Sequence, residues 1–322
     1  MFFLLTLATW LWLCDGITST MVTKTYRLMM VHTPNSIAYN VKSLSNSVKF
    51  YENVIGMSIY ANNEKNYELH YTKDNSNKLK VLLQSSDNSN SNNKSKSNEI
   101  GFKGIGLKLN KEDVVKAISL ADKYGGRVEV NLGDYAYGAS LIPDEDDLKQ
   151  FPVKYTHLMD PDGNGIEIIE EPEIPTMTSL NYKLDELNVF NKVIFNVIDI
   201  EETVMFYEMI FNMILIRKRS NVNGIPKDAS ISAFLVDNKD SYNTMIEFFY
   251  KYSIDKLDIK NTYQHMVMTT DNINNIKEKI EIYNNVHSKK SGYNCIDILS
   301  ESEISLIITD PINGYKIKIN KE

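Results

Sequence analysis

The stretch that decides the fold is residues 40–57, NVKSLSNSVKFYENVIGM, taken together with residues 196–213, NVIDIEETVMFYEMIFNM. Aligned without gaps at an offset of 156 positions, the two stretches share Asn, Val, Val, Phe, Tyr, Glu and Met. Each predicts a strand followed by an amphipathic helix, because apolar residues recur at helical spacing. In the first stretch these residues are Leu44, Val48, Tyr51 and Ile55. Similarity at a fixed offset indicates a duplicated unit.

A second pair of stretches supports the duplication. Residues 160–163 (DPDG) and 310–314 (DPING) are turn sequences built from Asp, Pro, Asn and Gly. Each is followed by a short stretch typical of a strand, IEII at 166–169 and KIKI at 316–319. The chain is therefore predicted to contain two copies of a unit of about 140 residues.

Each copy divides again into two modules of one pattern. In the first copy, the strand at 36–41 and its helix precede strands near 67–72 and 79–84. Residues 103–109 (KGIGLKL) then predict a new first strand, followed by a helix that Asn110 caps and that ends at Gly125 and Gly126. The second copy repeats the pattern with a strand at 264–270 and a helix at 272–283. The sequence thus predicts an α+β fold of four βαβββ modules.

The expected division of the chain is a leader, residues 1–30, and two domains, residues 31–172 and 180–322. Residues 85–99 (SSDNSNSNNKSKSNE) predict a disordered loop inside the first domain, because so polar a segment buries too little apolar surface to offset its ordering. Residues 170–175 (EEPEIP) predict an exposed linker between the domains.

The leader begins with an apolar run, residues 2–13 (FFLLTLATWLWL), which has signal-peptide length and is too short to span a bilayer comfortably. Lys24 and Arg27 follow without an acidic residue between them. This arrangement resembles the two-part leaders of proteins imported into a parasite plastid, the apicoplast. Plain secretion, or a start at Met21 that leaves the protein cytosolic, are the alternatives. The near absence of cysteine after the leader argues against secretion.

Composition excludes some classes of protein. The formal net charge of -7 disfavours a nucleic-acid-binding protein, which is usually basic. The two cysteines, Cys14 and Cys295, disfavour a disulfide framework and a structural zinc cluster. We expect a monomer of two fused domains, without a membrane segment once the leader is removed.

Four βαβββ modules, an FY pair in the first helix of each copy, and the terminal DPDG-x-x-IE hairpin resemble the vicinal-oxygen-chelate superfamily. The resemblance is strongest to two-domain glyoxalase I, over residues 34–320. It implies isomerisation of the hemithioacetal that methylglyoxal forms with glutathione, a thiol adduct that would be the small-molecule partner. A divalent metal such as zinc or nickel polarises the substrate oxygens, and a glutamate moves the proton.

The resemblance also implies four metal ligands at each site, one from each of four strand positions. Among the eight corresponding positions of this chain, three keep a ligating side chain: Glu167, Glu247 and His265. The other five hold Ser36, Leu82, Gly104, Lys192 and Lys318. A protonated lysine cannot bind a cation and repels it.

The grouping of these positions depends on how the modules pair. If the outer modules pair, as in glyoxalase I, one site holds Ser36, Leu82, His265 and Lys318. The inner modules would then form a second site with Gly104, Glu167, Lys192 and Glu247. Pairing within each copy is the alternative, and it groups Lys192, Glu247, His265 and Lys318. No pairing supplies four ligands.

The inner grouping allows two interpretations. In the first, Lys192 takes the place of the metal between Glu167 and Glu247, as a buried ion cluster. In the second, His157 lies across from Glu167 in a simple hairpin register and serves as a third ligand. In either case Glu167 and Glu247 are the candidate catalytic residues, and His157 and His265 complete the candidate metal ligands.

Two functions therefore remain open. One is a glyoxalase I-type lyase of altered activity, and the other is a degenerate member of the superfamily that binds a small molecule or a protein. The arginine that holds the glutathione carboxylate in the family corresponds to Asn40 and Asn196, which weakens the case for glutathione. A dioxygenase of the same fold would need two His and one carboxylate, and the matching positions do not supply them.

Overall fold

The computed structural model describes residues 34–70, 80–85, 99–136, 152–170, 190–221, 229–237, 244–252, 254, 256–259, 263–288 and 294–322. The predicted leader lies outside these residues, and so do residues 86–98 of the predicted loop and residues 171–189 between the predicted domains. Both ends of the loop prediction were wrong, because Ser85 ends one strand and Glu99 begins another.

The first half of the chain forms two modules. Module 1 consists of β1 (Ser36–Val41), α1 (Leu44–Phe50), a π-helical turn (Tyr51–Ile55), β2 (Ser58–Asn62), β3 (Asn66–His70) and β4 (Lys80–Ser85). Module 2 consists of β6 (Phe102–Leu109), α2 (Lys111–Leu120), a 3-10 turn (Asp122–Tyr124), β7 (Arg127–Ala136), β8 (Pro152–Met159) and β9 (Gly165–Glu170).

The second half repeats the plan. Module 3 consists of β10 (Phe190–Val197), α3 (Ile200–Phe211), β11 (Ile214–Asn221), β12 (Ser230–Val236) and β13 (Met245–Lys251). Module 4 consists of β15 (Tyr263–Thr270), α4 (Ile273–His287), β16 (Asp297–Glu301), β17 (Ser305–Thr309) and β18 (Lys316–Lys321). Two short strands, β5 (Glu99–Ile100) and β14 (Leu257–Asp258), pair with each other. The α+β plan of four βαβββ modules is confirmed.

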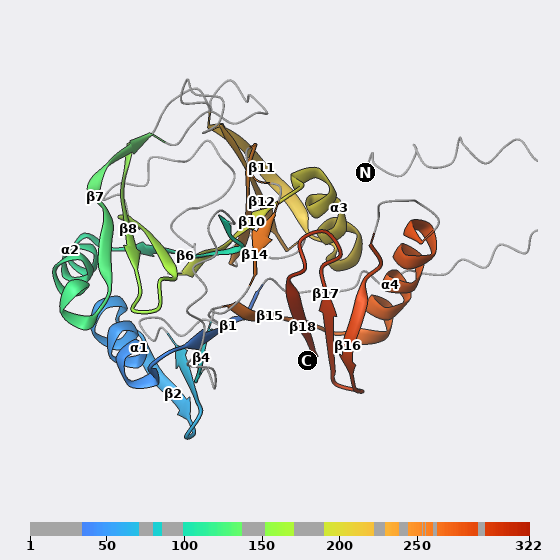
Figure 1. The fold of residues 1–322 in the computed structure, drawn as a ribbon, viewed down its shortest axis with the longest axis horizontal. Coiled ribbons are helices and arrows are strands. Elements are labelled where there is room, and N and C mark those ends of the chain that lie inside the picture. The colour runs from blue at the N-terminus through green and yellow to red at the C-terminus, as the bar shows by residue number, and fades with distance from the viewer. Residues whose placement is uncertain are drawn as a thin grey trace, which may run out of the picture.

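The modules pair across the two halves of the chain. One eight-stranded sheet, which we call the outer sheet, has the order β16-β17-β18-β15-β1-β4-β3-β2, and the inner sheet has the order β11-β12-β13-β10-β6-β9-β8-β7. Antiparallel pairing of β1 with β15 and of β10 with β6 joins the halves. In Figure 1 the blue β1 therefore lies beside the orange β15. This pairing excludes the alternative in which each half closes its own sheet.

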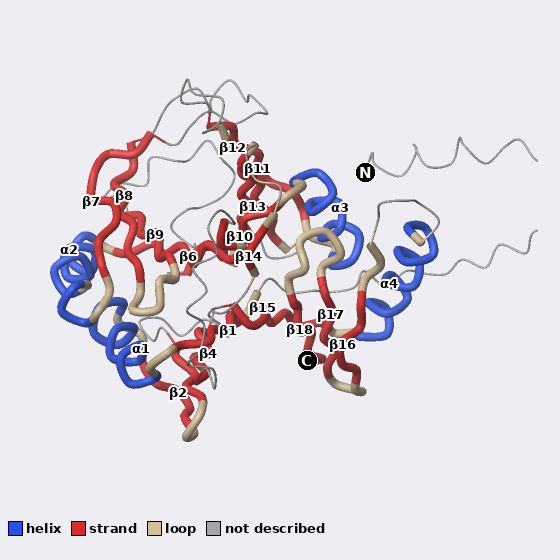
Figure 2. Tube along the Cα trace, viewed as in Figure 1, coloured by secondary structure: helices blue, strands red, loops and turns tan. Residues whose placement is uncertain are grey.

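The helices, in contrast, pack within each half. Helix α2 contacts the π-helical turn after α1, and α3 contacts α4. Figure 2 shows the two pairs on opposite sides of the molecule, with the strands between them. Each half thus supplies its own helical layer, while each sheet takes four strands from either half.

The repeated turn sequences anchor these helical pairs. In the first half, the hydroxyl of Tyr51 donates to Asp160 Oδ2 at 3.0 Å, and Ser47 donates to Asp162 Oδ2 at 2.8 Å. In the second half, Asn313 donates to Thr203 Oγ1 at 2.9 Å. The FY pair and the Asp-Pro turn recur together because the turn of one module is bonded to the helix of the preceding module.

Strand alternation gives each sheet one apolar face against the helices and one polar face. In β10, Val193, Phe195 and Val197 are fully buried in the core. Lys192 alternates with them and lies on the opposite face. We call this opposite side the polar face of the sheet, and the candidate site residues lie on it in both sheets.

Several local predictions hold. Asn110 caps α2 by accepting from the backbone of Asp113, and Gly125 has the left-handed φ of 82° expected at the end of this helical segment. Helix α4 continues four residues beyond the predicted end at Tyr283. Within the described part of the chain, no helix is long and apolar enough to cross a membrane.

Candidate functional site

The polar face of the inner sheet gathers charged side chains from four neighbouring strands. On β10, Lys192 lies beside Gly106 of β6, and Gly106 lies beside Glu167 of β9. The next residue of β10 on this face, Ile194, lies beside Glu247 of β13. Because the glycine at 106 carries no side chain, the Lys192 chain can reach across it to the carboxylate of Glu167.

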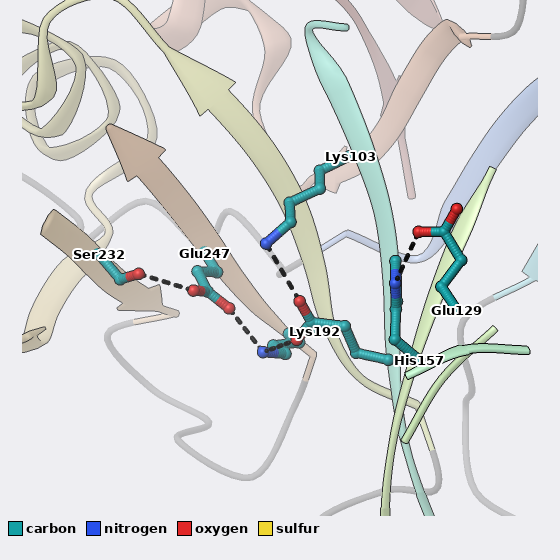
Figure 3. Close-up of polar contacts among 7 residues, drawn as sticks. Lys103, Glu129, His157, Lys192, Ser232 and Glu247 are labelled. Atoms are coloured by element: carbon teal, nitrogen blue, oxygen red, sulfur yellow. Dashed lines mark hydrogen bonds and ion pairs between the residues drawn. The ribbon is translucent and has the colours of Figure 1, made fainter. Parts of the chain in front are cut away.

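Lys192 bridges the two carboxylates. Its ammonium nitrogen lies 2.7 Å from Glu167 Oε2 and 2.6 Å from Glu247 Oε2 (Figure 3). The three side chains expose only 7%, 11% and 8% of their surface, in the order Lys192, Glu167, Glu247. This confirms the predicted ion cluster, and it brings together one carboxylate from each half of the chain.

The remaining carboxylate oxygens are also occupied. Lys103 donates to Glu167 Oε1 at 3.2 Å, and Ser232 donates to Glu247 Oε1 at 2.8 Å. Each of the four oxygens therefore has a donor within the protein. Two lysines balance two glutamates, so the cluster is neutral without any added ion.

The electrostatics keep Glu167 ionised. Burial alone would raise the pKa of Glu167, but the charge of Lys192 and then that of Lys103 outweigh it. The pKa of this carboxyl therefore lies well below its ordinary value. A carboxylate held in this state is a poor proton acceptor at neutral pH.

A β-bulge turns Lys103 onto the polar face. Gly104 pairs with Ile194 while Phe102 pairs with Phe195, so Lys103 is the extra residue between them. Gly104 has a φ of 147°, and a Cβ atom there would lie 1.9 Å from the carbonyl oxygen of Gly165. Only glycine fits this position, and its conformation places the Lys103 ammonium 4.2 Å from the Phe249 ring centroid.

His157 lies directly opposite Glu167 in the β8–β9 pairing, as the simple hairpin register predicted. Its Nδ1 nitrogen, however, lies 3.5 Å from Glu129 Oε2 on β7, on the side away from Lys192 (Figure 3). Burial lowers the pKa of His157 below its ordinary value. The structure therefore brings Glu167 and Glu247 together around Lys192 and joins His157 to Glu129.

The polar face of the outer sheet holds the equivalent positions. There Ser36 lies beside Val267, which lies beside Lys318, and Ala38 lies between Leu82 and His265. His265 is thus in a different sheet from Glu167 and Glu247. Burial, Lys318 and Lys316 lower the pKa of His265 to about 4.

The comparisons with known proteins agree with this architecture. Residues 33–168 match the family described as the Glyoxalase/Bleomycin resistance protein/Dioxygenase superfamily. A probable chloroplastic lactoylglutathione lyase of Arabidopsis thaliana is 22% identical over 262 residues, which are 80% of this chain and 65% of that protein. The lactoylglutathione lyase of Oryza sativa subsp. japonica is 31% identical over 118 residues, 37% of this chain and 38% of that protein.

Glyoxalase I from Zea mays has a crystal structure that superposes with a TM-score of 0.63 at 19% identity, covering 91% of this chain and 93% of that one. The chain has the fold of glyoxalase I, and residues 33–168 are similar in sequence to the glyoxalase superfamily. At this identity the maize structure shows the shared fold, and the chain spans less than two thirds of the length of the plant relatives named above.

The glyoxalase I-like fold implies a divalent metal, so the donor sets of both sheets can be tested for it. In the inner sheet the two carboxylates enclose an ammonium group, which repels a cation. In the outer sheet His265 faces two lysines. Among the residues that the structure describes, no group of three or more His, Cys, Asp or Glu side chains could hold a metal. Neither set fits the ion.

Three participants were missed from the sequence. Lys103 was not predicted because strict strand alternation places its side chain on the apolar face, and only the bulge at Gly104 turns that side chain to the polar face. Ser232 could have been found, because Ser230 and Ser232 alternate with the apolar Ile231 and Ala233 in SISAFLV. Lys316 alternates in the same way with Ile317 in KIKI.

Proposed function

We propose that this glyoxalase I-like protein binds a small molecule on its polar faces and has no metal-dependent lactoylglutathione lyase activity. The observation that supports the absence of metal-dependent activity is the position of Lys192, whose ammonium lies within 2.7 Å of both candidate catalytic carboxylates. The lysine stands where the family's metal would bind, and every carboxylate oxygen is already bonded.

The chemistry of the isomerisation supports the same conclusion. A glutamate base must accept a proton from carbon, and a metal must polarise the substrate oxygens. Here Glu167 has a depressed pKa and is bonded to two lysines. A lysine ammonium donates hydrogen bonds but offers no open coordination position for two vicinal oxygens.

Metal content tests the proposal. The purified chain would be incubated with nickel, cobalt or zinc, desalted and measured by elemental analysis, and thioester formation from methylglyoxal and glutathione would be followed by absorbance. We expect far less than one ion per chain and no rate above the uncatalysed reaction. One retained ion per chain, or a metal-dependent rate, would overturn the proposal.

Lys192→Gln provides a matched gain-of-function control. The substitution removes the positive charge and adds an amide oxygen, which is able to ligate a divalent cation. We expect Lys192→Gln to retain divalent metal, and Lys192→Gln combined with Glu247→Gln to lose it again. If the single variant stays metal-free while folded, as judged by circular dichroism, the lysine is not what excludes the ion.

Residual lyase activity is the second candidate. It is favoured by the convergence of Glu167 and Glu247 on one face and by the plant lyases among the similar proteins. If activity is found, Glu167→Gln and Glu247→Gln should each abolish it, while His265→Ala in the other sheet should not. Loss in His265→Ala with survival in both glutamate variants would refute the assignment to the inner sheet.

Three further expectations belong to the same proposal. We infer that the leader directs the protein to a plastid, that the chain is monomeric, and that glutathione is a poor ligand because Asn40 and Asn196 stand where the family has arginine. Fusion of residues 1–30 to a fluorescent reporter tests the first inference. Sedimentation and a glutathione titration test the other two, and a dimer or tight glutathione binding would refute them.

A further inference from the structure

The polar face of the outer sheet carries positive charge that no carboxylate of the described residues neutralises. Lys316 and Lys318 alternate on β18 with Ile317 and Ile319, which are fully buried against the helical side. Their side chains therefore emerge on the same face as His265 of the neighbouring strand. Within the described residues, neither lysine forms an ion pair with a carboxylate.

The carboxylates of this face lie elsewhere. Glu68 is on β3, four strands away, and is bonded to Lys80 at 3.1 Å and to His70 at 2.8 Å. Asp297 lies opposite Thr309 on the exposed edge strand β16. Glu68 is already neutralised, and Asp297 is exposed two strands away, so neither lysine has a counter-charge beside it in the part of the chain that the structure describes.

The inner sheet differs from the outer sheet at two equivalent positions. At the position equivalent to Lys318 it has Glu167, and at the position equivalent to Leu82 it has Glu247. These two carboxylates neutralise the lysines of the inner face. In the outer sheet these two positions hold Leu82 and Lys318 instead, so neither carboxylate is present there to neutralise a lysine.

We propose that the polar face of the outer sheet, around Lys316, Lys318 and His265, binds the compact dianionic group of a small molecule, a phosphate or a dicarboxylate. This inference rests on the proposed small-molecule binding and names the sheet and the ligand chemistry. Two lysines at positions i and i+2 of a strand start roughly 7 Å apart. Their flexible side chains can close on one dianion, because lysine binds phosphate as a mobile point charge.

His265 completes the arrangement. Its ring is partly buried on the same face as the two lysines, and burial, Lys318 and Lys316 lower its pKa, which favours the neutral imidazole. One ring nitrogen of a neutral imidazole donates a hydrogen bond and the other accepts one. The histidine therefore contributes a donor without adding a third charge, and it lies close enough to the two lysines to report on their state.

The test uses histidine resonances of the full chain, which has only five histidines. Metal would first be removed from the protein with a chelating resin. Inorganic phosphate and, separately, malonate would then be added, and the imidazole carbon–proton signals recorded against potassium chloride of equal ionic strength. We expect a saturable shift at His265 and none at His157. The probe with the lower midpoint identifies the phosphate or the carboxylate source.

Matched variants test the two lysines. Lys316→Gln and Lys318→Gln should each raise the midpoint by about tenfold or more, because each removes a charged hydrogen-bond donor. Lys321→Gln, on the same strand but on the opposite face, should leave it unchanged. No saturable shift with either probe, or midpoints that the first two variants do not alter, would overturn the inference.

These outcomes are separate from those that test the proposed function. Metal binding at the inner sheet would refute the metal-free proposal but would leave a phosphate-dependent shift at His265 in place, because the titration uses protein from which metal has been removed. Absence of that shift in a metal-free protein would refute only the dianion site.

Discussion

Substituting Lys192 by methionine tests whether the ion cluster holds the inner sheet together. The change keeps most of the length of the side chain and removes the ammonium. Glu167 and Glu247 would then face each other across a gap of about 5 Å, because both are bonded to the same nitrogen, inside a region that excludes most water. Two like charges in such a place destabilise the folded state.

The size of the effect follows from burial. Removing one partner of a buried ion pair typically costs about 3–5 kcal/mol, because the other charge stays buried without compensation. Lys103 still compensates Glu167, so we expect the lower end, about 3 kcal/mol of unfolding free energy at neutral pH. Neutralising all three groups, as in Glu167→Gln, Lys192→Met and Glu247→Gln together, should restore more than half of this loss.

The loss should depend on pH. In the wild type the folded-state pKa of Glu167 lies below the unfolded value of about 4.3, so its stabilisation is present above that pH and is lost only in strong acid. In the variant Glu167 loses the charge that lowers its pKa most, so burial and the neighbouring carboxylate raise that pKa. The penalty therefore grows as pH rises through the unfolded pKa, and the difference between the proteins is largest at neutral pH.

Urea unfolding followed by far-ultraviolet circular dichroism measures this difference, since both tryptophans, Trp10 and Trp12, precede the fold. Lys277→Met is the control, because its ion pair with the half-exposed Glu301 is on the surface and should change stability by less than about 1 kcal/mol. A loss below about 1 kcal/mol for Lys192→Met, or an equal loss at acidic and neutral pH, would refute the reasoning.

Three further predictions concern single residues. Tyr51→Phe should lower the unfolding free energy by about 1–3 kcal/mol, because it removes one hydrogen-bond donor from buried Asp160. Tyr207→Phe at the equivalent position should be neutral, since the buried Tyr207 hydroxyl has no hydrogen-bond partner among the described residues; urea titrations of both variants decide this. Gly104→Ala should destabilise the fold by more than about 3 kcal/mol, because the added Cβ atom clashes with the backbone. Gly163→Ala should cost only about 1 kcal/mol, because the added atom meets nothing within 4 Å. Equal shifts of the two variants in thermal melts would contradict this. The His265 imidazole should stay neutral in the folded protein until the pH falls to about 4. Its effect on the unfolding free energy is therefore most favourable above about pH 6.5 and becomes less favourable as the pH falls toward 4, because the unfolded state takes up the proton first. An ordinary pKa for His265 in an NMR titration would disprove this.

The repeat in the sequence was enough to predict the modules and much of the site. The constant offset between residues 40–57 and 196–213 indicates that β1 and β10 are equivalent strands. The strand alternation then places Lys192, Glu167 and Glu247 on one face. The ion cluster follows because lysine and glutamate at these positions attract each other once the inner modules pair. Which modules pair is set by contacts distant in sequence, so the repeat alone left it open.

The other features of the fold and the site could not be predicted from local sequence patterns. Strand β2 was missed because, beyond Ser58, all of its residues are exposed at the edge of the sheet, and no apolar alternation marks them. The bulge at Gly104 reverses the face of Lys103, and a one-residue insertion leaves no trace in the sequence. His157 was placed correctly opposite Glu167, but the contact that occupies it comes from β7, whose two register shifts were not predictable.

Because each sheet takes strands from both halves of the chain, the architecture has a genetic consequence. Separated from the other, either half would expose two unpaired strand edges, β1 and β6 in one fragment and β10 and β15 in the other. These edges are complementary, so the two fragments expressed as separate polypeptides should find each other and rebuild both sheets, as in a split reporter. A stop codon between them would not delete one site and spare the other; it would remove half of each.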